Sequence, residues 1–252
     1  MRELTLTALP GIPEVSEGAR LAELLLAAIA RAEKALKSGD VLVIAQKIVS
    51  KAEGRMVRLA DVAPSARAQE LARSVDKDPR LVELMLQESR EVLRAKRGVL
   101  IVEHRLGFVM ANAGIDQSNV PAESAAALLL PEDPDASARG IRDDVKQACG
   151  ADVGIVINDS FGRAWRNGVS GVAIGVAGIP ALVDLRGRAD RAGRVLRVTQ
   201  VAAADEIAAA ASLLMGQSDE GLPAVLVRGF PYPRRESSAT ELVRERAEDL
   251  FR

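Results

Sequence analysis

The chain has very little histidine, cysteine or aromatic content. Among 252 residues there is one histidine, His104, and one cysteine, Cys149, with four Phe, one Trp and one Tyr. A Cys/His zinc site and a Ser-His-Asp triad are therefore disfavoured, and so is a base-stacking surface for single-stranded nucleic acid. Cys149 has no partner for an intrachain disulfide, and we expect it to pack as a small hydrophobic residue. Any metal site is expected to use oxygen ligands, which favours Mg²⁺ or Mn²⁺.

The chain also lacks a charge excess and long apolar runs. Lys and Arg number 34 and Asp and Glu 35, giving a net charge of −1. We therefore expect neither nucleic acid nor a membrane as a partner, and a cytoplasmic location. The pattern Gly-x-x-x-x-Gly-Lys-Ser/Thr is missing, and the glycines of residues 171–178 do not form Gly-x-Gly-x-x-Gly. The sequence therefore contains neither a P-loop motif nor the dinucleotide-binding motif of a Rossmann fold.

The residues that are present predict a globular α+β protein. Apolar residues make up 48% of the chain, enough for a substantial core. Hydrophobic periodicity and turn residues predict helices and strands in no strict alternation, so we expect mixed, largely antiparallel sheets flanked by helices. Without a repeat or linker, residues 1–252 are expected to form one domain, with two subdomains as an alternative. The predicted helices are residues 17–37, 65–97 with a break at Pro79, 135–149 and 201–215, and the predicted strands are 41–45, 98–102, 153–157, 181–185 and 223–228.

The most informative stretch is residues 158–178, which follows the apolar run 153–157. Asp159 and Ser160 are expected at the carboxyl end of that strand, where an aspartate can hold a divalent cation. Arg163 and Arg166 offer forked donors for phosphate or carboxylate. Glycines such as Gly171 would let backbone amides approach an anion. The alternative is an ordinary polar turn after a core strand.

Two other segments carry candidate residues. Residues 112–119 (NAGIDQSN) could present several oxygen ligands, and Asp116 could share a cation with Asp159, although an Asx turn would use the same residues. Residues 46–55 (QKIVSKAEGR) place Lys47, Lys51 and Arg55 directly after the strand 41–45. Lysine at a strand end commonly meets phosphate, and the alternative is a solvated basic face.

Taken together, five segments resemble the coenzyme F420-0:L-glutamate ligase family. The likeness runs from about residue 9 to 230. The segments are residues 11–14 (GIPE), 39–55 (GDVLVIAQKIVSKAEGR), 113–119 (AGIDQSN), 130–137 (LPEDPDAS) and 159–168 (DSFGRAWRNG).

The resemblance implies a GTP-dependent ligase that adds L-glutamate to F420-0 through an acyl phosphate, and then adds further glutamates by γ-linkage. It implies an intertwined homodimer, two Mg²⁺ or Mn²⁺ sites and a helper K⁺. Some members of the family carry a reductase domain after the ligase, and we expect none here. Asp116, Asp159 and Lys51 would be catalytic, and the metal ligands would be Asp116, Asp159, Ser160 and Gln217. The GTP contacts would be Ile12, Pro13, Glu14, Val15, Gln46, Lys51, Asn119, Met215, Gly216, Gln217, Ser218 and Asp219.

One departure from the family pattern bears on function. Relatives commonly have Thr-Asp where this chain has Ser170 and Gly171, so a carboxylate is lost there. Two alternatives therefore stay open, a homologue that binds the deazaflavin or GTP without ligating, and an amide ligase for another small carboxylate.

Overall fold

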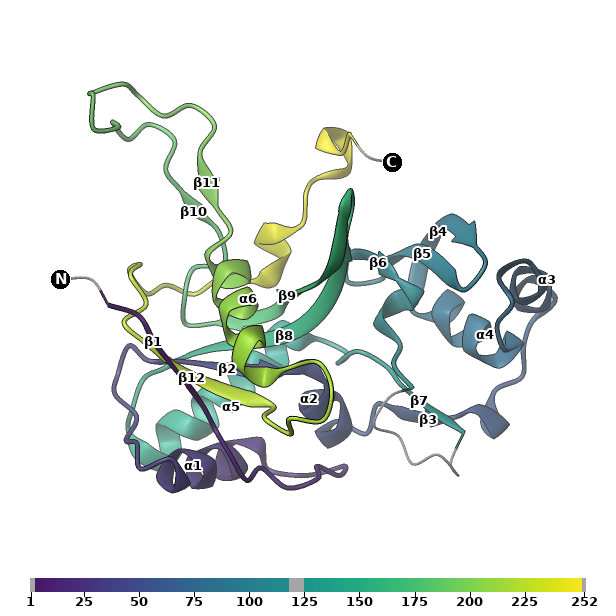
Figure 1. The fold of residues 1–252 in the computed structure, drawn as a ribbon, viewed down its shortest axis with the longest axis horizontal. Helices are drawn as coiled ribbons and strands as arrows, with labels where there is room; N and C mark the ends of the chain where they lie inside the picture. Colours follow the sequence, from purple (N-terminus) through teal and green to yellow (C-terminus); the bar gives the residue numbers. More distant parts are fainter. Residues whose placement is uncertain (1–2, 118–124, 251–252) are drawn as a thin grey trace.

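A computed structural model describes residues 3–117 and 125–250 (Figure 1). Its centre is a five-stranded sheet in the order β1-β12-β2-β8-β9. Only β2 and β8 run parallel, and the other neighbours are antiparallel. The strands are β1 (Thr5–Ala8), β12 (Ala224–Arg228), β2 (Val41–Ala45), β8 (Gly154–Arg163) and β9 (Arg166–Ala177). The expected α+β fold with mixed, largely antiparallel sheets is confirmed.

Helices cover both faces of this sheet and form the large lobe with it. Helix α6 (Ala203–Met215) packs on one face, while α1 (Leu21–Arg31) and α5 (Pro134–Cys149) pack together on the other. Gly171 and Gly175 of β9 permit this close packing. A Cβ at Gly171 would lie 2.4 Å from the Ala208 carbonyl oxygen of α6, and one at Gly175 would lie 2.4 Å from the Pro134 carbonyl oxygen of α5.

A small lobe, on the right in Figure 1, has its own hydrophobic core around Val82, Leu100 and Val102. It contains a three-stranded sheet, a two-stranded sheet and two helices. These are β4 (Ser89–Lys96), β5 (Val99–His104) and β6 (Val109–Ala111), then β3 (Met56–Arg58) with β7 (Ala126–Leu128), and helices α3 (Ala66–Val75) and α4 (Pro79–Gln87). Helix α2 (Gln46–Ala52) leads from the large lobe into it.

Two antiparallel pairs project from the large lobe (Figure 1). The far end of the β8–β9 hairpin exposes Trp165 and Val169. A second arm begins with the short pair β10 (Val183–Asp184) and β11 (Gln200–Val201) and exposes Val195 and Val198. No helix within the described ranges is both long and apolar enough to cross a lipid bilayer.

Four expectations from the sequence are wrong in detail. Residues 89–96 form strand β4 rather than more helix, because pairing with β5 overrides their helical propensity. Helix α1 is much shorter than 17–37. Strand β8 runs on past Ile157 to Arg163, so Asp159 and Ser160 lie inside a paired strand rather than at its carboxyl end. Cys149 is exposed at the end of α5 rather than packed.

Candidate active site

Asp159 lies where β8 changes from a buried strand to a partly exposed hairpin. Its register partner is Val172, and its Oδ1 accepts a hydrogen bond of 2.8 Å from the Ser160 amide. Burial raises the pKa of Asp159 to about 6, and the nearby Asp116 carboxylate adds to the rise, while the Ser160 amide and Lys47 act in the opposite direction. A carboxylate whose ionisation is opposed by burial and by a like charge is suited to receive a cation.

Asp116 reaches this position from the small lobe. Its backbone exchanges two hydrogen bonds with Leu128, which holds it beside β7. The Asp116 Oδ2 lies 2.6 Å from Lys47 Nζ, and Lys47 is in the first turn of α2. Lys47 and Asp116 also interact with Asp159. The structure therefore pairs Asp116 with Lys47 and places both near enough to Asp159 for their charges to act on its ionisation.

Helix α2 carries two other predicted residues on its buried side. Lys51 is only 8% exposed and its Nζ forms an ion pair with Glu14 Oε1. The predicted segment 12–15 therefore lies against α2. The buried Gln46 donates to Ser50 Oγ over 2.9 Å and to the Leu129 carbonyl oxygen over 3.5 Å. Asn119, the remaining predicted contact of this group, lies outside the described residues.

The predicted segment 215–219 follows α6 and is tied to β8 by Asn158. The Asn158 Nδ2 donates to Ser212 Oγ over 3.1 Å and approaches Met215 Sδ at 3.5 Å. Met215 is buried, Gly216 has a φ of 72°, and Gln217, Ser218 and Asp219 are exposed. Ser160 is two residues beyond Asn158, so the strand alternation points it toward α6 and away from the face of Asp159.

Arg163 and Arg166 are not brought to the aspartates. They pair with each other at the exposed end of the β8–β9 hairpin. With a rise of about 3.3 Å per residue, Arg163 is about 13 Å from Asp159 along the strand. Gly171, predicted to admit an anion, faces α6, where a Cβ would lie 2.2 Å from Ser212 Oγ. That expectation is wrong, since helix packing occupies the space.

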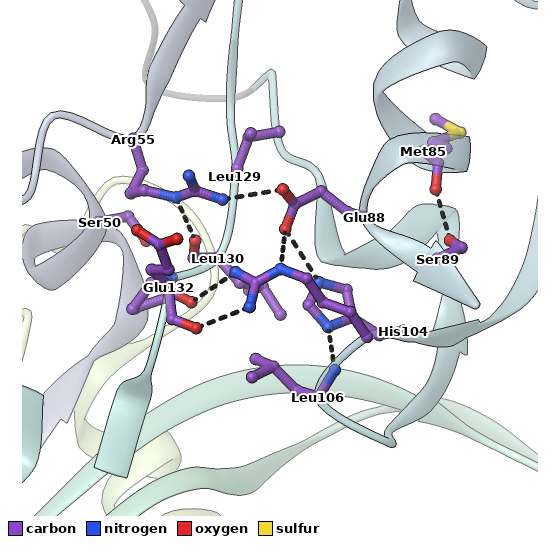
Figure 2. Close-up of polar contacts among 12 residues, drawn as sticks. Ser50, Arg55, Met85, Glu88, Ser89, His104, Leu106, Leu129, Leu130 and Glu132 are labelled. Atoms are coloured by element: carbon purple, nitrogen blue, oxygen red, sulfur yellow. Dashed lines mark hydrogen bonds and ion pairs between the residues drawn. The ribbon is translucent and has the colours of Figure 1, made fainter. Parts of the chain in front are cut away.

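A buried ionic cluster joins the two lobes next to this region (Figure 2). Glu88, at the end of α4, receives Arg55 Nη2 on Oε1 and Arg105 Nε on Oε2, both at 2.9 Å, while His104 Nε2 lies 3.4 Å from Oε2. Burial opposes ionisation of Glu88, but His104, Arg105 and Arg55 outweigh it and lower its pKa to about 2. Arg55 also donates to the Leu130 carbonyl oxygen over 2.9 Å. The cluster fixes the end of α2 against the small lobe that carries Asp116.

The donor atoms fit a hard divalent cation. Asp116 and Asp159 supply two carboxylates to one cation, whereas the Ser160 hydroxyl lies on the other face of β8 and would belong to a different one. Mg²⁺ is held by one or two carboxylates, with phosphate and water completing its shell. Among the described residues no group of three or more His, Cys, Asp or Glu side chains is clustered for a metal. The two carboxylates therefore fit a metal whose remaining coordination positions are filled by a phosphate-bearing substrate and water.

Sequence reasoning missed three contributors to this geometry. Lys47 was recognised only as part of a basic segment, although its position in the first turn after β2 could have placed it beside Asp159, because β2 and β8 are parallel neighbours. Asn158 is the first residue of the segment 158–178, and its sequence context assigns it no role of its own. Glu88 lies in a polar helical stretch and has no sequence signal that separates it from a solvated carboxylate.

Comparison with known proteins identifies the family of this chain. The family model described as F420-0:Gamma-glutamyl ligase matches residues 11–229. The protein named coenzyme F420:L-glutamate ligase of Methanothermobacter thermautotrophicus is 45% identical over 251 residues, covering 99% of each chain. Proteins of the same name from Methanopyrus kandleri and Archaeoglobus fulgidus are 46% and 44% identical over 95% and 96% of this chain and 94% of their own lengths. The chain belongs to the F420-0:gamma-glutamyl ligase family.

Proposed function

We propose that this protein ligates L-glutamate to coenzyme F420-0 at the expense of GTP, at the site formed by Asp116, Asp159 and α2. The observation that carries the proposal is the meeting of Asp116 and Asp159 from different lobes beside Lys47. Two carboxylates with a lysine suit a metal-bound phosphate chain, which an amide ligase that activates a carboxylate must hold. Family membership supplies the two substrates.

The chemistry needs an activated carboxylate. An oxygen of the F420-0 carboxylate attacks the γ-phosphorus of GTP and GDP leaves; the glutamate amine then attacks the acyl carbon and phosphate leaves. Asp116 and Asp159 would hold one Mg²⁺ or Mn²⁺, and Ser160 with Gln217 a second, and these cations neutralise charge on the transferring oxygens when bound. Lys51 would hold a phosphate from its buried position beside Glu14. By the resemblance, residues 12–15, Gln46 and segment 215–219 would contact GTP, as would Asn119, which lies outside the described residues. Such catalysis rests on positioning and electrostatics, so it needs no histidine base.

The finer features are part of the same proposal. Further glutamates are added by γ-linkage, because the product again ends in a carboxylate that the same site can activate. K⁺ assists as a helper cation. The competing function, binding of the deazaflavin or GTP without ligation, is motivated by Gly171. The tight packing of Gly171 on α6 supports a structural role for this departure from the family pattern.

We also propose that the protein acts as a homodimer through its two projecting pairs. Trp165 is 70% exposed at the end of the β8–β9 hairpin and Val198 is 85% exposed on the arm that begins with β10 and β11, and contact with a second copy would cover these apolar side chains. The same interface would bring Arg163 and Arg166 against the other copy. Light scattering should give twice the mass of one chain, and Trp165→Ser with Val169→Ser should give the single mass. A wild-type protein with the mass of one chain would contradict the dimer.

Ligation is tested by release of GDP. The purified protein with Mn²⁺ and K⁺ should convert GTP to GDP only when F420-0 and L-glutamate are both present. Replacement of F420-0 by other small carboxylates tests the alternative amide ligase. Tight GTP binding without GDP release under any of these conditions would favour the binding homologue instead.

A further inference from the structure

A cavity of about 390 Å³ lies where the two lobes meet. The small lobe contributes Arg90, Arg105 and Phe108 to its wall, and the large lobe contributes Arg139 of α5 and Ile174 of β9. The segment Ser238–Thr240 completes the lining. None of these residues is among those assigned above to GTP or metal. A cavity of this size holds a small organic molecule or one part of a larger one.

Most charged side chains of this cavity already form hydrogen bonds or ion pairs with other groups of the protein. Arg105 donates to Glu88 and to the Glu132 and Pro131 carbonyl oxygens. The Asp135 carboxylate accepts hydrogen bonds from the amides of Val176 and Ala239 and from Ser238 Oγ. Asp133 Oδ1 caps α5 through the Ala136 amide. The carboxylates of the cavity are therefore satisfied by donors of the chain.

Two arginines of the cavity retain donors for a ligand, and they come from different lobes. Arg139 is exposed and makes no hydrogen bond or ion pair within residues 3–117 and 125–250. Arg90 has one weak contact, 3.5 Å from Nη1 to Glu103 Oε1, and its side chain is 60% exposed. Each guanidinium has five N–H donors and recognises carboxylate or phosphate in a forked geometry.

The cavity borders the face of the β8–β9 hairpin on which Asp159 lies. Phe108, in its wall, packs edge to face on Phe161 with ring centroids 6.1 Å apart. Phe161 is two residues beyond Asp159, and side chains two apart on a strand share a face. Leu106 offers partly exposed apolar surface beside the arginines, and the buried Phe108 and Ile174 lie behind it in the lining. The cavity therefore combines an anion-binding wall with a surface for a carbon skeleton, next to the proposed reaction site.

We propose that this cavity is a substrate subsite in which Arg90 and Arg139 bind an organic anion while Leu106 and the edge of Phe108 contact its carbon skeleton. The inference rests on the proposed function. Both proposed substrates carry a suitable anion, either a carboxylate of L-glutamate that does not react or the phosphate group of F420-0. Because its arginines come from both lobes, the subsite would also favour the arrangement in which Asp116 meets Asp159.

The test replaces Arg139, which is exposed and whose loss should leave the fold intact. In Arg139→Gln, and separately in Arg90→Gln, the KM for one of the two substrates should rise about tenfold, as expected for loss of a charged hydrogen bond, while the KM for GTP stays unchanged. A rise for L-glutamate assigns the subsite to the amino acid, and a rise for F420-0 assigns it to the phosphate. Arg139→Lys should restore part of the affinity. Arg67→Gln, an exposed arginine of α3, is the matched control.

Unchanged KM values for L-glutamate and F420-0 in both variants would overturn the subsite and leave the ligase proposal standing. If the wild-type protein shows no ligation, the proposed function fails, and calorimetry with L-glutamate and with F420-0 tests the cavity independently. Binding of either probe that weakens in Arg139→Gln supports the subsite. Equal binding to both proteins, or no binding to the wild type, contradicts it.

Discussion

Lys47 Nζ lies 2.6 Å from Asp116 Oδ2, at the place where Asp116 comes near Asp159. The lysine offsets the repulsion between two carboxylates contributed by separate lobes. It also competes with any cation that those carboxylates would bind. Removal of the lysine charge should therefore lower the stability of the metal-free protein and strengthen cation binding, and both effects can be measured on the purified protein.

In Lys47→Gln, the Tm without metal should fall by a few degrees, because a favourable charge pair of about 1 kcal/mol is lost. The increase in Tm on adding Mn²⁺ should be larger than in the wild type, because the competing cation is gone. Differential scanning fluorimetry with and without Mn²⁺ measures both values. Lys34→Gln is an exposed control. An Mn²⁺ effect equal to that of the wild type would argue against a cation site at Asp116.

Asp159→Asn should keep the fold and remove divalent-dependent turnover. The pKa of Asp159 is raised to about 6 by burial and by Asp116, so its charged form destabilises the folded protein at neutral pH. A neutral amide should therefore leave Tm equal to or above the wild-type value, while kcat falls by about 100-fold or more, as for loss of a transition-state charge contact. Full activity in this variant would rule out Asp159 as a metal ligand.

Lys51→Ala should mainly raise the KM for GTP. The Lys51 side chain is buried beside Glu14, so its ammonium is directed at the segment 12–15 rather than at bulk solvent. Loss of a charged contact to phosphate should raise KM about tenfold or more. Initial rates at varied GTP measure it, with Lys34→Ala as the control. An unchanged KM would mean that Lys51 serves only to hold Glu14.

The Glu88 cluster should make the free energy of unfolding depend on pH in the acid range. The pKa of Glu88 is about 2 in the folded protein against an ordinary value of 4.5, so its stabilising contribution is present above pH 4.5 and is lost as pH falls toward 2. The shift corresponds to about 3 kcal/mol. Glu88→Gln should cost about 3–5 kcal/mol at pH 7, because two partly buried arginines lose their counter-charge. It should also flatten the acid dependence between pH 5 and 2.

Urea unfolding of wild type and Glu88→Gln across this pH range measures both quantities. Glu70→Gln, an exposed carboxylate of α3, is the control. Parallel pH profiles for wild type and Glu88→Gln would mean that the cluster contributes no pH-dependent stability.

Gly171→Ala should destabilise the contact between α6 and the hairpin. A Cβ there would meet Ser212 Oγ at 2.2 Å and the Ala208 carbonyl oxygen at 2.4 Å, and such overpacking costs about 1–3 kcal/mol. Gly162→Ala, in the same hairpin, meets nothing within 4 Å and should be nearly neutral. Equal free energies of unfolding for the two variants would show that α6 can move away without cost.

Apolar patterns were enough to predict the central strands β2 and β8 and helices α5 and α6, because these elements are defined by burial. The outer half of β8, residues 158–163, is polar and is held as a strand by pairing with β9, so the apolar pattern predicts only the strand 153–157. Strand β4 was assigned to a helix for the same reason. The meeting of Asp116 with Asp159 could be expected from their chemistry, but the Glu88 cluster depends on lobe packing and has no local signal.

Mass spectrometry of F420-0 incubated with the protein, L-glutamate, GTP, Mn²⁺ and K⁺ tests the central claim most directly. The account predicts a mass gain by whole glutamyl units that disappears when GTP, L-glutamate or Mn²⁺ is omitted and in Asp159→Asn. The number of units added gives the length of the tail. No gain in mass by the wild-type protein, with GTP bound and all components present, would contradict it.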